Sequence, residues 1–140
     1  MKLQLMEKMK QYMGVGWWIL KAVPQAAPLL CIPKKLGKLR TVIDCQQRND
    51  NTVKDVTLFP DQDQIQIDVA QAKFRSKIDL SNAYEQVRIK LEDIHKTAFA
   101  TVYGMCKSNV LQQGDCNGPA TFQRLMTAIF QDKIGIFVHD

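Results

Sequence analysis

The amino-acid sequence predicts an α+β fold in which helices pack on one face of an antiparallel sheet. Residues 3–13 and 119–132 carry apolar side chains at helical spacing. The segments between them are mostly short, alternate in polarity and are separated by turn residues, as strands are. The chain has 140 residues, which is enough for one domain with a sizeable core.

The first predicted helix covers residues 3–13 and ends at Gly14. Its expected stripe consists of side chains about three residues apart, namely Leu3, Met6, Met9 or Lys10, and Met13.

A short apolar run follows at residues 17–20. Three prolines between residues 23 and 33 exclude a long helix there and favour extended chain or an edge strand. Residues 30–43 predict a basic hairpin whose tight turn surrounds Gly37, because β-rich sequence lies on both sides of that glycine.

Residues 44–55 are polar and predict a loop. Residues 61–72 predict a helix, with Asp61 or Asp63 as the residue that caps its N-terminus. In the second half of the chain the pattern predicts strands at 74–80, 87–89, 97–103, 108–111 and 134–138. The clearest helix is 119–132, which has Pro119 in its first turn and an apolar stripe.

Composition narrows the class of protein. No apolar run approaches the roughly 18 residues of a membrane span, so we expect no membrane partner, and no signal peptide is visible. The four cysteines form no C-x-x-C pair, which argues against a zinc site or a disulfide framework. We therefore expect reduced thiols in an intracellular protein of the cytoplasm or nucleus.

Positive charge is concentrated in the first part of the chain. The formal net charge is +5; residues 1–60 carry ten Lys or Arg against four Asp or Glu, whereas residues 61–140 carry nine against ten. This distribution suits a phosphate-rich partner such as nucleic acid, but a solvated basic surface is the alternative, and a net charge of this size does not decide between them.

Asp79 is the candidate metal ligand, because it ends a predicted strand where a rigid carboxylate would suit a hard cation. A turn or capping role is the alternative, since the next residues have turn chemistry. The other carboxylates of this region, Asp68, Glu85, Glu92 and Asp93, lie in patterns typical of exposed helix or turn.

The basic hairpin gathers four cations, Lys34, Lys35, Lys38 and Arg40. They could clamp a triphosphate or a nucleic-acid backbone, with the arginine offering a fork of donors that matches phosphate. A solvated hairpin tip is the alternative.

Several segments together resemble the reverse transcriptase of Ty3/gypsy-type long-terminal-repeat retrotransposons, in that family's order and spacing over roughly residues 5 to 139. The segments are PQAAPL (24–29), KKLGKLR (34–40), VID (42–44) with Arg48-Asn49, KIDLSNAYEQ (77–86), DIHKTAF (93–99), QQGDCN (112–117) and PATFQRLM (119–126).

The resemblance implies template-directed nucleotidyl transfer with Mg²⁺ as cofactor. By match to the family motifs, Asp79 would be the first metal-binding and catalytic aspartate. Tyr84 would be the aromatic residue that excludes a ribose 2′-hydroxyl. The incoming nucleotide would lie over the backbone of Leu80, Ser81, Asn82 and Ala83.

The same resemblance implies that Lys34 and Arg40 bind the triphosphate and that Gln113 contacts the incoming nucleotide. Lys35 and Lys38 would contact nucleic acid. The partners would be an RNA or DNA template–primer and a deoxynucleoside triphosphate. The remainder of the polyprotein, with thumb, connection and RNase H, is expected to lie outside this chain.

The expected fold is an incomplete right-hand polymerase spanning residues 1–140, mostly fingers over about 1–75 and partial palm over about 76–140. The family's Tyr-x-Asp-Asp turn would follow Asp140, so two further metal aspartates are missing. We therefore expect the chain to be catalytically incomplete by itself. The alternative function is a non-catalytic nucleic-acid-binding remnant or domesticated fragment.

Overall fold

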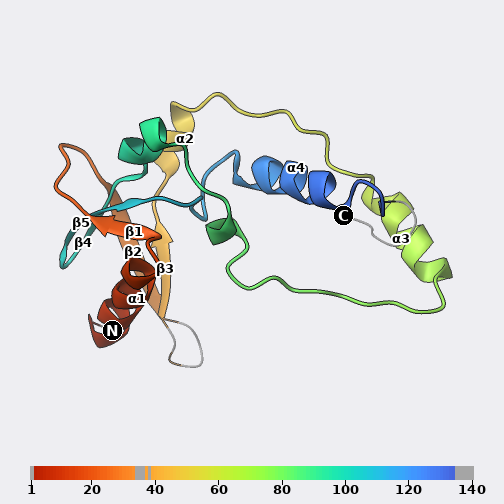
Figure 1. The fold of residues 1–140 in the computed structure, drawn as a ribbon, viewed down its shortest axis with the longest axis horizontal. Coiled ribbons are helices and arrows are strands. Elements are labelled where there is room, and N and C mark those ends of the chain that lie inside the picture. The colour runs from red at the N-terminus through yellow and green to blue at the C-terminus, as the bar shows by residue number, and fades with distance from the viewer. Residues whose placement is uncertain (1, 34–36, 38, 135–140) are drawn as a thin grey trace.

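The computed structural model describes residues 2–33, 37 and 39–134. A five-stranded sheet with one helix against it forms one end of the molecule, and two further helices lie beyond the sheet (Figure 1). The elements in chain order are α1 (Lys2–Gly14), β1 (Trp18–Leu20), β2 (Ala27–Pro33), β3 (Leu39–Ile43), α2 (Gln46–Asp50), α3 (Gln62–Gln71), the 3₁₀ helices η1 (Tyr84–Gln86) and η2 (Leu91–Thr97), β4 (Phe99–Thr101), β5 (Gly104–Ser108) and α4 (Gly118–Phe130).

The strands follow the order β1-β5-β4-β2-β3, and this mixed α+β architecture confirms the predicted fold class. Three of the four neighbouring pairs are antiparallel, including the β2–β3 hairpin that the sequence predicted. The exception is β2 beside β4, a parallel pair in which Ala27 lies opposite Phe99. A parallel pair needs a long crossover, and the sequence pattern of either strand alone does not reveal which distant strand it joins.

The core lies between α1 and one face of the sheet. Leu5, Met9 and Tyr12 are buried on α1, and they meet Trp18 and Phe99 of the sheet. The rings of Tyr12, Trp18 and Phe99 are packed edge to face in series, with centroids 4.8 Å and 4.7 Å apart. Aromatic side chains bury large apolar areas, so this chain of rings anchors the helix to the sheet.

The predicted helix 3–13 is confirmed, but its expected stripe is confirmed only at Met9, which is buried. Leu3 is 68% exposed, and Met6 and Met13 also face solvent. The helix instead turns the face with Leu5 and Tyr12 inward, because that face carries the ring that fits beside Trp18.

Helix α3 begins after Asp61, whose carboxylate accepts hydrogen bonds from the backbone N–H groups of Asp63 and Gln64. This confirms the predicted N-cap. Helix α4 is also confirmed, with Pro119 in its first turn.

Among the α-helices that the structure describes, α1 has the main contacts with the sheet, at β1 and β3, and the 3₁₀ helix η2 also packs against β5. Helices α3 and α4 lie well to one side of the sheet, and two long connections reach out to α3 (Figure 1).

Five local predictions are wrong in whole or in part. Residues 74–80 are not a strand, and Phe74 and Ile78 are 86% and 83% exposed. A strand is stable only when its backbone groups pair, and among the described residues nothing pairs with this segment. The expected loop at 44–55 contains the short helix α2.

The segment 97–103, expected as one strand, is β4 followed by a tight turn that leads into β5. Residues 108–111 do not form a separate strand; only the last residue of β5 and one isolated bridge, between Arg88 and Val110, fall in that region. The strand expected at 87–89 is present only as that bridge, which is flanked by backbone hydrogen bonds from Ile89 to Asn109 and from Leu111 to Val87. Most of the strand expected at 134–138 lies outside the described residues.

Candidate nucleotide-binding site

Two of the segments with predicted nucleotide contacts meet at the N-terminal end of α4. The backbone N–H of Leu111 donates to the carbonyl of Val87 at 2.8 Å, and that of Ile89 donates to the carbonyl of Asn109 at 2.9 Å. These bonds join the chain after η1 to the chain before Gln113. Tyr84 and Gln113, 29 positions apart in the sequence, are thereby brought to one end of the same helix.

The half-buried ring of Tyr84 rests on α4. Its centroid lies 5.7 Å from that of Phe122, with the ring planes 34° apart. A Cβ atom added to Gly118 would lie 3.1 Å from Cε1 of Tyr84, closer than ordinary van der Waals contact. The helix therefore holds the ring from below, and the lack of a side chain at Gly118 leaves the space that the ring occupies.

The loop that carries Gln113 is held by Arg48. The Arg48 guanidinium forms an ion pair with Asp115 and donates a 2.8 Å hydrogen bond to Oε1 of Gln112. It also donates to Sγ of Cys45 at 2.9 Å and to the carbonyl of Lys96 at 3.2 Å. An arginine offers five donors in a rigid fork, so a single side chain can join α2 to this loop and to the end of η2.

Asn49 adds a second attachment between α2 and the loop. Its Nδ2 donates to the carbonyl of Gly114 at 2.8 Å, and its Oδ1 accepts from the backbone N–H of Cys116 at 3.0 Å. Gly114 has a φ of +107°, a backbone conformation that residues other than glycine rarely adopt. It lies against Cys45 and Ile43. As a result the loop is fixed on both sides of Gln113, whose own side chain is exposed.

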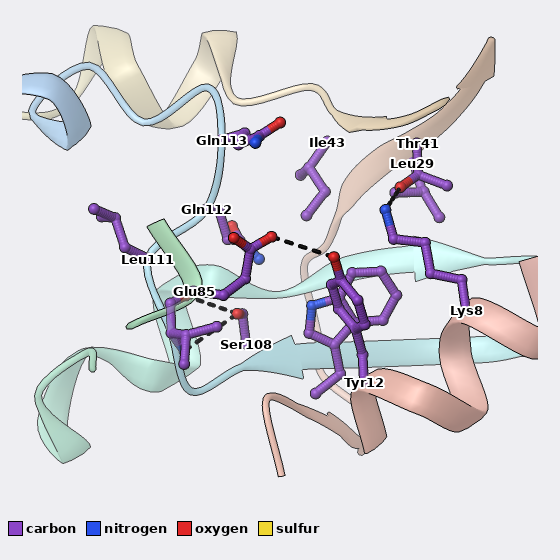
Figure 2. A pocket seen from close by; sticks show the side chains of 12 residues that line it. Lys8, Tyr12, Leu29, Thr41, Ile43, Glu85, Ser108, Leu111, Gln112 and Gln113 are labelled. Atoms are coloured by element: carbon purple, nitrogen blue, oxygen red, sulfur yellow. Dashed lines mark hydrogen bonds between the residues drawn. The ribbon is translucent and has the colours of Figure 1, made fainter. Parts of the chain in front are cut away.

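A small cavity of about 40 Å³ lies below this loop, between α1, β3 and η1 (Figure 2). Its walls include Tyr12, Glu85 and Gln113. A volume of this size holds a few water molecules and is too small for a nucleoside triphosphate. A nucleotide that contacts Gln113 would therefore lie outside this cavity.

Glu85 is half-buried in the cavity wall, so the expectation of an exposed carboxylate is wrong. The Tyr12 hydroxyl donates to its Oε1 at 3.3 Å, and its Oε2 is buried without a partner (Figure 2). Burial, and then the negative charge of Glu85, raise the pKa of Tyr12 to about 12. This contact ties α1 to the residue that follows Tyr84.

Asp79 and the residues after it lie in a different setting. Asp79, Leu80, Ser81 and Asn82 are exposed at the end of the long connection from α3, and Ala83 is half-buried. Asn82 has a φ of +53°, which a turn residue such as asparagine tolerates. No hydrogen bond or ion pair joins Asp79 to Tyr84 or Gln113 in the part of the chain that the structure describes.

The described residues do not fit a magnesium site. Nowhere among them do three His, Cys, Asp or Glu side chains converge so that they could hold a metal ion. Asp79 is exposed and belongs to no such group, whereas Mg²⁺ needs an octahedral set of oxygen ligands held in place.

Of the basic hairpin, Lys34, Lys35 and Lys38 lie outside the described residues. Arg40 is exposed on β3, opposite Ile32 of β2. Side chains alternate along a strand, so Arg40 points away from the cavity that its neighbour Thr41 lines. The hairpin therefore carries Arg40 on the face of the sheet that does not pack against α1.

Sequence reasoning did not identify Arg48, Gln112, Asp115 or Tyr12 as parts of this site. Arg48 and Asp115 are 67 positions apart, and no spacing rule connects them. The available signal was that both lie in motif segments and carry opposite charges.

Two further expectations have a structural outcome. All four cysteines are free thiols. No helix in the described ranges is both long enough and apolar enough to cross a bilayer.

Comparison with known proteins identifies the family. Residues 32–138 match the family described as "Reverse transcriptase (RNA-dependent DNA polymerase)". The chain is 32% identical over 117 residues to the retrovirus-related Pol polyprotein from transposon opus of Drosophila melanogaster, covering 80% of this chain and 12% of that polyprotein. It is 31% identical over 104 residues to the transposon Tf2-3 polyprotein of Schizosaccharomyces pombe, covering 74% of this chain and 8% of that polyprotein.

Solved structures agree on the fold. The protease–reverse transcriptase of prototype foamy virus superposes with a TM-score of 0.87 at 20% identity, over 99% of this chain and 19% of that one. A foamy viral protease–reverse transcriptase in complex with double-stranded DNA superposes with a TM-score of 0.82 at 24% identity, over 99% of this chain and 24% of that one. The chain thus spans about a tenth of the matched polyproteins and a fifth to a quarter of the matched structures. It belongs to the reverse transcriptase family, of the type that Ty3/gypsy retrotransposon polyproteins carry.

Proposed function

We propose that this chain is the part of a reverse transcriptase that binds the template–primer and seats the incoming nucleotide. The observation that carries the proposal is that Tyr84 and Gln113 both lie near the start of α4. Tyr84 packs on the helix, and Gln113 belongs to the loop that Arg48 holds in place. Residues that contact a substrate are commonly held in position by rigid elements and by hydrogen bonds from neighbouring side chains. Tyr84 and Gln113 are supported in this way. In this assignment residues 1–75 are mostly fingers and residues 76–140 are part of the palm.

The matched foamy viral enzyme is described in complex with double-stranded DNA, which supports a nucleic-acid partner for this chain. The net charge of +5 and the basic first part of the chain also favour a polyanion. Arg40, and the lysines of its hairpin, would contact phosphates, while Tyr84 would lie against the sugar of the incoming nucleotide.

The proposal assigns binding to this chain and not the complete reaction. Asp79 would be one ligand of the catalytic Mg²⁺, and the remaining ligands would have to come from carboxylates that the described residues do not bring to it.

The first experiment is binding of a labelled RNA–DNA hybrid, followed by fluorescence anisotropy over a range of salt concentrations. We expect an affinity that falls steeply with salt, because each phosphate contact releases counterions. Arg40→Gln should weaken binding, whereas Arg75→Gln, which removes an exposed arginine that bonds only to carbonyls near the end of α3, should not. Absence of hybrid binding at low salt would refute the proposed function.

The second experiment is primer extension on a poly(rA)/oligo(dT) template with Mg²⁺, comparing the chain with its Asp79→Ala variant. We expect no incorporation by either protein. Incorporation that depends on Asp79 would show that another carboxylate completes the site, for instance one from a second copy of the chain. A chain that binds the hybrid without extending it is the expected result, and it agrees equally with the alternative, a non-catalytic nucleic-acid-binding remnant or domesticated fragment.

A further inference from the structure

A second and much larger hollow, of about 680 Å³, lies beside the edge strand β1. We call it the β1–β5 groove. Its walls come from the turn before β1, from β1 and β5, and from residues 85–95. None of the predicted nucleotide-binding residues lines it. Its volume falls in the range of about 300 to 1,000 Å³ that is usual for ligand sites.

The register of the strands places the groove on the face of the sheet opposite α1. Ile19 of β1 lies directly opposite Lys107 of β5, and Lys21 continues the same side of β1. The intervening side chains of Trp18 and Cys106 are buried on the other face, in the core. The groove and the small cavity near Gln113 share only Glu85 and Val110 in their walls, and the cations of the groove do not line the cavity.

The groove is basic. Lys21, Arg88 and Lys107 line it, and none of them forms an ion pair among the described residues. Glu85 is the one carboxylate in its lining, and Tyr12 already donates a hydrogen bond to it. Three unpaired cations around one hollow create a local positive potential that attracts phosphate groups.

Between these cations the groove is lined by one tryptophan and several aliphatic side chains, together with the polar Gln86, His95 and Asn109. Trp17 is half-buried, and Ile19 and Leu91 expose much of their side chains. An aromatic surface between cations is the arrangement that binds single-stranded nucleic acid, because unpaired bases offer flat faces for stacking. A double helix offers only its phosphates to such a groove, since its bases are already stacked.

We propose that the β1–β5 groove binds a single strand of nucleic acid, with phosphates at Lys21, Arg88 and Lys107 and a base against Trp17. The inference depends on the proposed function only because the partner is again a nucleic acid. It assigns a second contact region, on residues other than those expected to bind the nucleotide or the template–primer.

The test compares two variants of equal charge. The groove variant carries Lys21→Gln, Arg88→Gln and Lys107→Gln. The control variant carries Lys54→Gln, Lys77→Gln and Lys133→Gln, which removes three exposed cations that do not line the groove. Circular dichroism and thermal melting confirm that both variants fold. The probe is a fluorescein-labelled 20-nucleotide single strand, measured by anisotropy between low and moderate salt.

We expect the groove variant to lose about tenfold or more in affinity at low salt. Its salt dependence, the slope of log K against log salt, should become shallower by about 2, because three phosphate contacts at about 0.7 each are lost. The control variant should keep most of its affinity and most of its salt dependence. Equal losses in the two variants would refute the proposal, since net charge alone would explain the binding.

An optical signal gives a second, independent test. In the background of Trp18→Phe, Trp17 is the remaining tryptophan. Its fluorescence should be quenched on addition of the single strand, and the quenching should be lost in the groove variant. Binding without any change in Trp17 fluorescence would refute the stacking contact.

The outcomes separate this inference from the proposed function. If the RNA–DNA hybrid binds and the groove variant retains full affinity for the single strand, only the groove inference fails. If neither nucleic acid binds, both fail. If the groove variant changes the sedimentation coefficient of the protein and not its affinity for nucleic acid, the groove is a contact between copies of the chain and the inference is wrong.

Discussion

Gly118 and Tyr84 are in such close contact that a Cβ atom on the glycine would lie 3.1 Å from Cε1 of the ring. Tyr84 belongs to η1 and Gly118 begins α4, so this contact fixes how the 3₁₀ helix sits on the longer helix. Gly118 does not have a positive φ, and its backbone would accept alanine. The glycine is therefore required by the tyrosine ring and not by the backbone.

Gly118→Ala should destabilise the protein only while the ring of Tyr84 is present. The added methyl group forces the ring to move by a few tenths of an ångström, which opposes the gain in helix propensity of alanine over glycine. We expect a coupling free energy of about 1 kcal/mol between Gly118→Ala and Tyr84→Ala in a double-mutant cycle measured by urea unfolding.

Gly14→Ala is the matched control, because nothing lies within 4 Å of the position where its Cβ would be. It should show no coupling to Tyr84→Ala. A coupling of zero for Gly118 would mean that the ring has free room to move.

Arg48→Met should lower the free energy of unfolding by about 2 kcal/mol. The substitution leaves the carboxylate of Asp115 without its cation and Oε1 of Gln112 without its donor, in a region where the Arg48 and Asp115 side chains are only 20% and 18% exposed. Denaturation in urea measures the loss.

Lys96→Met is the comparison for Arg48→Met. It also removes one positive charge, but from an exposed ion pair with Asp93. Its cost should be about 0.5 kcal/mol or less, because solvent screens exposed pairs. Similar losses for the two variants would contradict the role assigned to Arg48 as the brace of the Gln113 loop.

Tyr12→Phe should make the protein less sensitive to alkaline pH. The Tyr12 pKa is raised from its ordinary value of 10.0 to about 12 in the folded protein. The unfolded chain therefore loses this proton first, and the stability that the neutral phenol contributes is lost as the pH rises from 10 to 12. Unfolding measured at several pH values should show a shallower alkaline decline for Tyr12→Phe than for the parent chain. An unchanged decline would indicate that burial and the Glu85 contact do not hold the phenol neutral.

The thiols should react in two groups. Cys45 and Cys106 are buried and burial raises the pKa of each, whereas Cys31 and Cys116 are partly accessible. A chromogenic disulfide reagent at neutral pH should therefore modify two thiols of the native protein well before the other two, and all four at once in denaturant. Mass spectrometry of the partly modified protein should find the label on Cys31 and Cys116, and early label on Cys106 would contradict the packing described here.

Local chemistry made some elements predictable. Asp61 caps α3 and Pro119 opens α4 because each acts within its own helical turn. The hairpin around Gly37 follows from two β-rich segments next to a residue that allows a positive φ. The motif order likewise led to the reverse transcriptase family, which the comparison with known proteins confirms.

The sequence by itself therefore determined the helices with clear caps, the hairpin, the fold class and the family. The tertiary structure decided what depends on partners far along the chain. Residues 74–80 alternate like a strand but stay unpaired, since an alternating pattern does not supply a neighbouring ladder. Arg48 and Asp115 are 67 positions apart, and only the folded backbone makes them an ion pair. Periodicity is a property of neighbouring residues, whereas burial, register and pairing are set by contacts that no local pattern records.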